Sequence, residues 1–280
     1  MEEPRLLAVF AHPDDESFGT GGTLARYSRE GVEVHVCTVT DGAAGSYSVD
    51  EPAPGKTLSL ADLRRQELAC ACQVLGAELH TLNYRDSGMP GTPENQHPNS
   101  LFQADLDDVA TDLLRVIGQV RPHVILTHDP SGGYSHPDHI KVNQAMCRAW
   151  DRLAEIGWRP LRLYYAVIPR SSLRWFMLIM RLFRRDIRRF GQNRDVDLSD
   201  IGVPDEQIHV RLDVGAFLAI KERASACHKS QGGAGAPRLL PRFIRRRVLR
   251  CEYFVQAQPP GAPVHHDLWE GLELPARRAS

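Results

Sequence analysis

The sequence predicts an α/β fold: a Rossmann-like, mostly parallel sheet with helices on both faces, built as a single domain with C-terminal elaborations. Short β-branched runs alternate with longer helical stretches along the chain, a pattern typical of a parallel sheet covered by helices. The 280 residues are 42% hydrophobic and 25% charged, which suits a globular chain and excludes a disordered or fibrous one. No apolar run approaches the roughly 18 residues that a membrane span requires.

The apolar runs and their flanking residues define the expected elements. The strands are Leu6–Phe10, Val32–Val39, Glu78–Leu82, His123–Thr127 and Leu161–Ile168, and the helices are Gly19–Glu30, Leu60–Leu75, Gln103–Val120 and His139–Leu153. The second helix has a defined start and end, because Ser59 stands at its N-cap and Gly76 follows its last residue. Residues 86–102 and 231–241 are rich in glycine and proline, so we expect loops that act as lids or binding loops.

Charge is unevenly distributed along the chain. Residues 1–140 hold 21 acidic and 9 basic side chains, whereas residues 141–280 hold 14 acidic and 25 basic ones. Arginine supplies 30 of the 34 cationic residues, which biased codon usage could produce without any function. Many of the arginines lie in 171–190 and 231–250, which we expect to be basic insert or lid segments within one domain spanning 1–280.

These basic segments allow two kinds of contact. The favoured interpretation is a lid or homo-oligomer contact over the mouth of the site. Peripheral membrane contact is the alternative, because a helix with Trp, Phe and Leu on one side and arginines on the other can lie at a membrane interface. No nucleic-acid-binding motif accompanies the arginines, so no nucleic-acid partner is expected.

The N-terminus and the cysteines predict a cytoplasmic protein. Met1-Glu2-Glu3-Pro4 is acidic, and the apolar run Leu6–Phe10 is too short for a signal peptide. The six cysteines are scattered and lack a CxxC pair, so we expect reduced, mostly buried thiols. Cys70 and Cys72 lie two apart on a helix and do not share a face, and both are expected in the core.

The first chemical motif, Ala11-His12-Pro13-Asp14-Asp15-Glu16, directly follows the first strand. In open α/β sheets, ligands bind outside the carboxyl ends of the strands. A dinucleotide site is disfavoured, because Leu24 stands where the third glycine of the fingerprint belongs and the loop is acidic. An imidazole and two carboxylates this close together would repel one another without a cation, which favours a metal site. The alternative is that the acidic residues only cap the following helix.

The second motif follows the fourth strand. Three histidines and two aspartates lie within the twelve residues His128–His139, beside a Gly132-Gly133 hinge. If the strand order is 3-2-1-4-5, strands one and four are neighbours, and their carboxyl-end loops face each other across one crevice. Two imidazoles and a carboxylate with an open position are typical of catalytic zinc, and the same set serves non-haem iron. The alternative is a helix N-terminus with incidental histidines.

Together these residues resemble the LmbE/PIG-L family of metal-dependent N-deacetylases, which act largely on N-acetylglucosaminyl compounds. The resemblance rests on AHPDDE (Ala11–Glu16) and HPDH (His136–His139), with further matches at Arg64-x-x-Glu67, Asp86-Ser87-Gly88-Met89, Gly133-Tyr134 and Lys221…His228-x-Ser230-Gln231. The loop Asp86–Met89 is most similar to the bacterial subgroup that handles glucosaminyl-inositol and mycothiol-type substrates. The chain departs from that subgroup at Ala43-Ala44-Gly45, where acidic residues are usual, and this leaves the aglycone open.

The resemblance implies a role for each matched residue. His12, Asp15 and His139 would bind zinc, with iron as the alternative, and Asp14 would be the general base. His136 would be cationic or a proton donor to the oxyanion, Asp138 would orient His136, and Tyr134 would move with the Gly-Gly segment to hold the oxyanion. The substrate contacts would be Arg64, Asp86, Met89 and His228.

We therefore expect a cytoplasmic, zinc-dependent hydrolase that removes the N-acetyl group from an N-acetylglucosamine-containing small molecule. One alternative is an amidase that acts on a larger acyl group, such as that of a thiol conjugate. Another is a peripheral membrane protein that acts on or binds a glycolipid.

Overall fold

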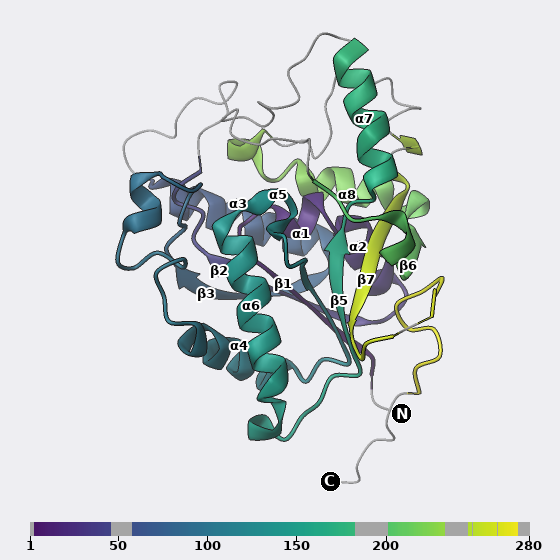
Figure 1. Cartoon of the computed structure of the whole chain (residues 1–280), viewed down its shortest axis with the longest axis horizontal. Coiled ribbons are helices and arrows are strands. Elements are labelled where there is room, and N and C mark those ends of the chain that lie inside the picture. The colour runs from purple at the N-terminus through teal and green to yellow at the C-terminus, as the bar shows by residue number, and fades with distance from the viewer. Residues whose placement is uncertain are drawn as a thin grey trace.

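The computed structural model describes residues 3–45, 58–182, 201–232, 246–247, 249–261 and 263–273, without the side chains of 176 and 179–182. Within these residues, seven strands form one sheet in the order β3-β2-β1-β4-β5-β7-β6 (Figure 1). The strands are β1 (Arg5–Phe10), β2 (Glu33–Thr40), β3 (Ala77–Tyr84), β4 (Val124–His128), β5 (Arg162–Val167), β6 (Val210–Asp213) and β7 (Cys251–Gln258). Strands β1 to β5 are parallel, and β7 pairs antiparallel with both β5 and β6.

Helices cover both faces of this sheet. One face carries α2 (Gly21–Arg29), α3 (Leu60–Leu75) and α8 (Leu218–Ser225), and the other carries α4 (Leu106–Val120) and α6 (Pro137–Asp151). The remaining helices are the short α1 (Asp15–Phe18) and α5 (Gly132–Ser135), α7 (Arg170–Leu182), and the 3-10 turns η1 (Pro93–Gln96), η2 (Leu153–Ile156), η3 (Asp205–Gln207), η4 (Gly215–Phe217) and η5 (Lys229–Gln231). The expected α/β class, with its parallel central strands, is therefore confirmed.

The core lies on both sides of the central strand β1. Leu6, Ala8 and Phe10 pack under α2, α3 and α8, whereas Leu7 and Val9 pack under α4 and α6. Successive residues of a strand point to opposite faces, so a strand buried on both sides is apolar throughout. This double packing fixes the end of β1 from which the first motif projects.

Several expected boundaries are confirmed, and others are corrected. The side chain of Ser59 accepts the Asp62 N–H at 3.1 Å, and Gly76 ends α3 in the left-handed conformation with φ 75°. The expected helix Gly19–Glu30 is found as α2, which covers Gly21–Arg29, and the short helix α1 before it was not predicted. Sequence reasoning missed β6 and β7, because it placed no strand beyond residue 168.

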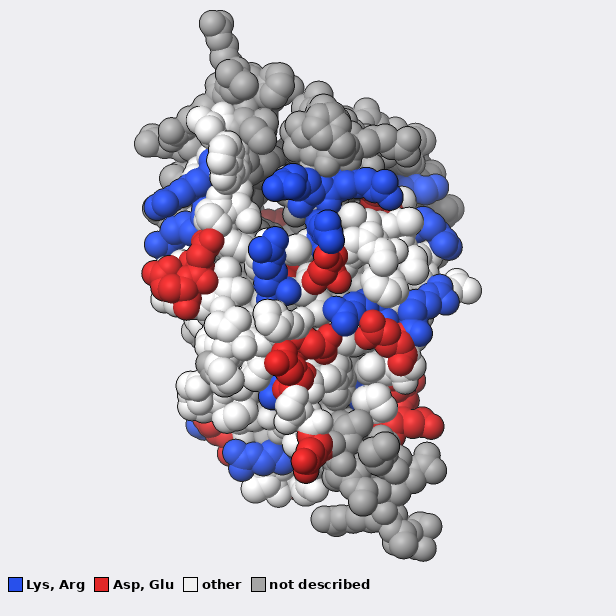
Figure 2. All heavy atoms as spheres, turned by 90° about the vertical axis from the view of Figure 1, so that its right-hand side faces the viewer, with Lys and Arg blue, Asp and Glu red and all other residues white. Residues whose placement is uncertain are grey.

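The basic segments predicted at 171–190 and 231–250 fall partly outside the described residues. Helix α7 carries exposed Trp175 and Leu178, and it projects from the rest of the molecule (Figure 1). Basic side chains gather across the upper part of the face seen in Figure 2, with acidic ones mixed among them lower down. In the part of the chain that the structure describes, no helix combines the length and apolar character needed to cross a bilayer. The single domain spanning 1–280 stays a prediction.

A buried carboxylate joins the C-terminal elements to the rest of the fold. Glu252 of β7 accepts the N–H groups of Gly22 and Thr23 at 2.9 and 2.7 Å, and it pairs with Lys221 of α8 at 2.6 Å. Lys221 and Glu252 are 5% and 4% exposed. Removing one partner of such a pair leaves a buried charge uncompensated.

We predict that Glu252→Gln lowers the free energy of unfolding by about 3–5 kcal/mol, because Lys221 keeps its buried charge without a counterion. The matched control is Glu30→Gln, which breaks the exposed pair between Arg26 and Glu30 and should cost no more than about 1 kcal/mol. Chemical denaturation of both variants measures the difference. Equal losses would show that Glu252 does not join these elements.

Candidate active site

Three loops meet at the carboxyl edge of the sheet. Strands β1 and β4 pair in register from Leu6 with Val124 onward, which places the loop after β1 beside the loop after β4. The N–H of Ala11 donates to Nε2 of His128 at 3.0 Å and joins these two loops. The loop after β3 completes the site, because the Ser87 N–H donates to Asp138 at 2.9 Å. The expected meeting of strands one and four is confirmed.

Three side-chain atoms of this edge form a compact triangle. Nδ1 of His12 lies 3.1 Å from Nε2 of His139 and 3.6 Å from Oδ2 of Asp15, and the third side, His139 to Asp15, is 3.4 Å. Metal–ligand distances of about 2.0–2.1 Å in a tetrahedral zinc site give ligand–ligand edges of about 3.3–3.4 Å. The triangle therefore has the size of one face of such a site.

The hydrogen bonds around the triangle determine where the histidine protons are. Nε2 of His12 donates to Asp138 at 3.2 Å, and Nδ1 of His139 donates to the carbonyl oxygen of Gly132 at 3.2 Å. With both outer N–H groups held, the two ring nitrogens that face each other at 3.1 Å need a cation between them, either a proton or a metal ion. Outer partners of this kind are typical of metal-binding histidines, so the residues fit a metal.

The electrostatics of the triangle also favour a positive charge. Burial alone would lower the pKa of His12, but the carboxylates of Asp86, Asp138 and Asp15 raise it well above its usual value. For Asp15, burial acts to raise the pKa, and His139 and His128 more than offset it, so the pKa lies well below the usual range. Asp15 is therefore a carboxylate, as metal binding requires.

His128 belongs to this site although sequence reasoning gave it no role. Its ring stacks on that of His139 at a centroid separation of 3.8 Å. Because its Nε2 accepts the Ala11 N–H, that nitrogen has no free lone pair for a metal. Burial, followed by His139, lowers the pKa of His128 to about 4. His128 is thus a neutral support for His139. Its position at the end of β4 was the one feature of the sequence that could have placed it in the site.

Asp14 lies next to the triangle in an unusual backbone conformation. Its φ of 125° is rare for a residue other than glycine, and such outliers cluster at functional sites. The Asp14 N–H donates to Glu16 at 2.9 Å, and its carboxylate meets Arg64 at 3.3 Å. Burial raises the pKa of Asp14 to about 6, while Arg64 acts to lower it. A carboxylate with a pKa near neutrality suits a general base.

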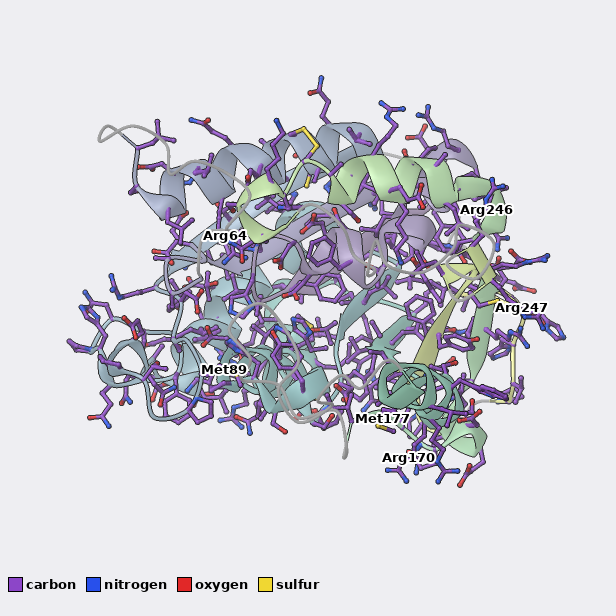
Figure 3. The ribbon with its side chains drawn as sticks, turned by 90° about the horizontal axis from the view of Figure 1, so that it is seen from above. Arg64, Met89, Arg170, Met177, Arg246 and Arg247 are labelled. Carbon is purple, nitrogen blue, oxygen red and sulfur yellow. A yellow bond between two sulfur atoms is a disulfide. The ribbon has the colours of Figure 1, made fainter. Side chains whose placement is uncertain are left out.

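Arg64 and Met89, both expected to contact substrate, differ in exposure. Arg64 is 3% exposed, and its guanidinium donates to the carbonyl oxygens of Pro13 and Gly42 at 2.6 and 2.9 Å. It therefore fastens the loop that carries Asp14. Met89 is half-buried in the loop after β3. In Figure 3, Arg64 and Met89 lie on the same half of the molecule, away from Arg170 and Met177 of α7.

Asp138 and Asp86 both contact His12, a contact that was predicted for neither residue. The prediction that the Asp138 carboxylate orients His136 is wrong, because that carboxylate bonds Nε2 of His12 and the Ser87 N–H. Asp86, expected to contact substrate, is 3% exposed, and its Oδ1 lies 3.5 Å from the same Nε2. Both carboxylates therefore support His12. The sequence spacing could not show this, because it depends on how the three loops meet.

His136 and Tyr134 present hydrogen-bond donors beside the triangle. Nδ1 of His136 accepts the Asp138 N–H at 3.2 Å, which leaves the ring proton on Nε2. Burial, followed by His12 and His139, lowers the pKa of His136 to about 2, so the neutral donor fits the structure and the cationic form does not. Burial raises the pKa of Tyr134, which keeps its hydroxyl protonated. The Tyr134 ring lies 5.2 Å from that of His139.

The position of Tyr134 depends on the glycines before it. Gly132 and Gly133 have φ of 67° and 68°, in the left-handed region that favours glycine. A Cβ on Gly132 would lie 2.7 Å from Cγ1 of Ile140. Asp129 accepts the Gly133 N–H at 2.8 Å and holds this turn.

A cleft adjoins the site on the β3 side. Its volume is about 530 Å³, and it is lined by Asp41, Leu82, Asn83, Tyr84, Arg85, His97, Pro98, Asn99, Ser100 and Ala104. Oδ1 of Asp41 accepts the Asp86 N–H at 3.0 Å, so the loop that supports His12 also forms part of this wall. The lining is polar and offers hydrogen bonds for hydroxyl groups.

His228 has no exposed surface, so it does not face open solvent as a substrate contact would. Its Nε2 lies 2.7 Å from Oε1 of Glu16, whose other oxygen accepts the Asp14 N–H. Burial acts to lower the pKa of His228, but Glu16 raises it above the usual value. His228 therefore supports the Asp14 loop from behind.

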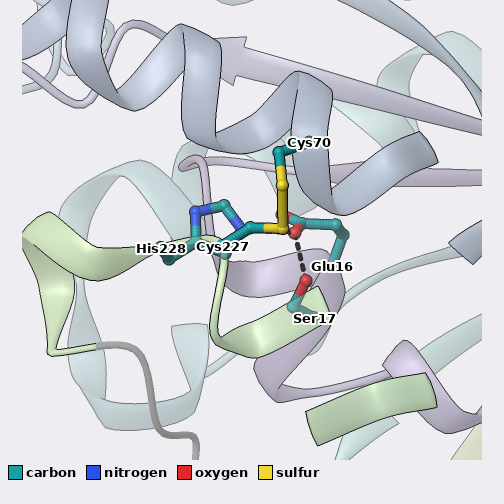
Figure 4. Close-up of a disulfide and its surroundings, with 5 residues drawn as sticks. All are labelled: Glu16, Ser17, Cys70, Cys227 and His228. Atoms are coloured by element: carbon teal, nitrogen blue, oxygen red, sulfur yellow. Dashed lines mark hydrogen bonds and ion pairs between the residues drawn. A yellow bond between two sulfur atoms is a disulfide. The ribbon is translucent and has the colours of Figure 1, made fainter. Parts of the chain in front are cut away.

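The residue before His228 forms a disulfide. Cys227 is bonded to Cys70 of α3, beside Glu16 and Ser17 (Figure 4). The prediction that all six cysteines are reduced is wrong for this pair, and Cys37, Cys72, Cys147 and Cys251 are free. Cys72 lies in the core as predicted, whereas Cys70 is exposed. Sequence spacing gave no signal for the bond, because 157 residues separate its ends.

Comparison with known proteins agrees with this geometry. Residues 7–150 match the PIG-L family, described as GlcNAc-PI de-N-acetylase. A relative from Acidothermus cellulolyticus, the 1D-myo-inositol 2-acetamido-2-deoxy-alpha-D-glucopyranoside deacetylase, is 38% identical over 96% of this chain and 95% of its own length.

Solved structures share the fold at lower identity. The conserved protein TT1542 from Thermus thermophilus has a TM-score of 0.57 at 22% identity, over 94% of this chain and 97% of its own. GalB, the 4-carboxy-2-hydroxymuconate hydratase from Pseudomonas putida, has a TM-score of 0.58 at 20% identity, over 92% of this chain and 98% of its own. Because a hydratase shares this fold, the fold alone does not determine the activity.

The disulfide gives a prediction for stability. A reductant that opens Cys70–Cys227 should lower the free energy of unfolding by about 2–4 kcal/mol, because the unfolded chain regains a long open loop. Cys70→Ser should cost a similar amount, and reductant should then change that variant no further. Urea denaturation with and without reductant measures both. A wild-type midpoint that reductant leaves unchanged would contradict the bond.

Proposed function

The chain belongs to the PIG-L family of de-N-acetylases, and we propose that it is a zinc-dependent deacetylase of an N-acetylglucosaminyl-inositol. It is a hydrolase of amide C–N bonds, and its substrate is a small molecule that contains N-acetylglucosamine. The inositol aglycone and the choice of zinc are the specific parts of the proposal. The named activity of the Acidothermus cellulolyticus relative supports the aglycone.

One observation carries the proposal: the ligand triangle of His12, Asp15 and His139. Its sides of 3.1, 3.4 and 3.6 Å match one face of a tetrahedral zinc site, and the outer N–H of each histidine is already held. Three protein ligands leave a position for water or substrate. The two imidazoles and single carboxylate also suit iron, and zinc is preferred for the tetrahedral dimensions.

The other residues divide the work of amide hydrolysis. When bound, the metal lowers the pKa of water and polarises the substrate carbonyl. Asp14 takes the proton of the attacking water as the new C–O bond forms. Nε2–H of His136 and the hydroxyl of Tyr134 donate to the oxyanion, where one such donor is worth about 10²–10³ in rate. The C–N bond then breaks and Asp14 returns its proton to the leaving amine. The remaining proton of the water passes from the new carboxyl group to the amine, so acetate and the ammonium form of the sugar depart.

The cytoplasmic location stays a prediction. Disulfides such as Cys70–Cys227 are rare in reducing compartments, so the redox state of this cysteine pair in the cell bears directly on the compartment.

We also infer that α7 contacts an anionic membrane surface. Trp175 and Leu178 are 69% and 59% exposed on this helix, and Arg170 and Arg174 are exposed beside them. An apolar stripe flanked by arginines suits an interface with anionic lipids. A symmetric contact between two copies would bring the same arginines together, so a membrane surface fits the charge better than a homo-oligomer does.

The catalytic roles are tested by two substitutions. Asp14→Asn should keep the metal content of the wild type but lower turnover by about 10²–10⁴, because the general base is lost. His139→Ala should lose one equivalent of metal and all measurable turnover. Metal analysis with acetate release from N-acetylglucosaminyl-inositol gives both readouts, and Asp151→Asn on the exposed end of α6 is the control.

Near-normal turnover of Asp14→Asn would contradict the assignment of the base. The same assay with larger acyl groups on the glucosamine separates the deacetylase from a broader amidase. Faster release of a bulky acyl group than of acetate would overturn the proposed substrate and leave the metal site unaffected.

For α7, we predict that the wild-type protein sediments with vesicles of phosphatidylglycerol at low salt and not with vesicles of phosphatidylcholine. Replacing Trp175 and Leu178 together with glutamate should abolish sedimentation, because both the apolar contact and part of the charge attraction are lost. Wild-type protein that stays in the supernatant with both vesicle types would contradict membrane contact.

A further inference from the structure

A second group of metal-ligand side chains lies on the sheet, apart from the active site. His35 comes from β2, and Glu78 and His80 come from β3. His35 pairs in register with Glu78, and Cys37 pairs with His80. Alternate residues of a strand share a face, and cross-strand neighbours on that face lie within reach of one another. The register therefore places these three side chains together.

This group is separate from the ligand triangle. His35 lies opposite Leu7 of β1, and Leu7 precedes His12 by five residues. At about 3.3 Å per residue, the two groups are roughly 16 Å apart along the strand direction. Neither the metal triangle nor the residues around Asp14 take part in the second group.

The donor atoms of the second group face one another. Nδ1 of His35 lies 3.1 Å from Nε2 of His80, and the two oxygens of Glu78 lie 3.8 Å from the former and 3.9 Å from the latter. The Glu78 side chain is 64% exposed, so it is free to move inward. The distance between the two histidine nitrogens of this group is the same as the distance between Nδ1 of His12 and Nε2 of His139 in the active site.

A carboxylate also lies behind His35, which is 4% exposed: Nε2 of His35 is 3.3 Å from Oε1 of Glu33. This contact is not a hydrogen bond, and among the described residues Nε2 has no hydrogen-bond partner. The contact between Nδ1 of His35 and Nε2 of His80 is therefore the one that a metal ion would bridge.

We propose that His35, Glu78 and His80 bind a second divalent transition-metal ion of the zinc class. Two imidazoles and a carboxylate suit zinc, copper or nickel, whereas calcium and magnesium require oxygen ligands. The proposal rests on these side chains alone and does not depend on the deacetylase activity.

The position of the second site indicates a structural role. Among the described residues, β3 is an outer strand of the sheet and pairs with β2 on one side only. The metal would fasten β3 to β2 through a link between side chains. β3 leads directly into the loop of Asp86, which supports His12, so the second ion would stabilise the strand from which that loop starts.

Equilibrium dialysis against micromolar zinc, followed by metal analysis, tests the proposal. The wild type should hold two equivalents of zinc, and each of the single variants His80→Ala and His139→Ala should hold one. The double variant that combines both substitutions should hold none. His266→Ala, an exposed histidine outside both groups, is the matched control and should hold two. Zinc should also raise the Tm of His139→Ala but not that of the double variant.

A single equivalent in the wild type, or equal zinc content in the wild type and His80→Ala, would overturn the proposal and show a hydrogen-bonded histidine pair. If His80→Ala does not fold, as judged by circular dichroism without metal, Glu78→Gln provides the test, because Glu78 is exposed. That variant should bind the second ion at least tenfold more weakly, and unchanged affinity would overturn the site. The His139→Ala variant reports separately on metal at the catalytic site. Failure to find the second ion therefore leaves the proposed function unaffected.

Discussion

The contact between the facing ring nitrogens of His12 and His139 is the constraint on which the rest of the site depends. Their 3.1 Å separation requires a cation between the two rings, either a proton or a metal ion. The carbonyl oxygen of Gly132 and the Asp138 carboxylate hold the outer N–H groups and prevent either ring from taking the other tautomer. The site is therefore prepared for a metal by its hydrogen bonds, and a metal ion would take the place of the proton between the two rings.

Buried polar contacts around this pair hold the surrounding loop in an unfavourable conformation. Asp14 keeps its positive φ because its N–H is bonded by Glu16 and its carboxylate by Arg64. Glu16 is in turn paired with His228, next to the Cys70–Cys227 bond. The strain at Asp14 is stabilised by the packed elements α3 and α8 behind it, which links the distant C-terminal part of the chain to catalysis.

The sequence allowed the central strands and the metal ligands to be predicted, because both depend on local pattern. The apolar run of β1 and the motifs at His12 and His139 are visible without a structure. Three features were not predictable from the sequence: the partner of Asp138, the acceptor role of His128 and the Cys70–Cys227 bond. They depend on strand register and ring orientation between segments that are far apart in the chain. Strands β6 and β7 were missed for a related reason: they extend the sheet antiparallel, outside the β–α alternation that identified the others.

The central claim is that His12, Asp15 and His139 hold a metal in tetrahedral geometry. X-ray absorption at the zinc edge, on the His80→Ala variant loaded with one equivalent of zinc, tests it most directly, because that variant retains the catalytic ligands. The expected spectrum shows only nitrogen and oxygen neighbours at about 2.0–2.1 Å, with scattering from two imidazoles. Sulfur neighbours, or a spectrum without imidazole scattering, would contradict the claim.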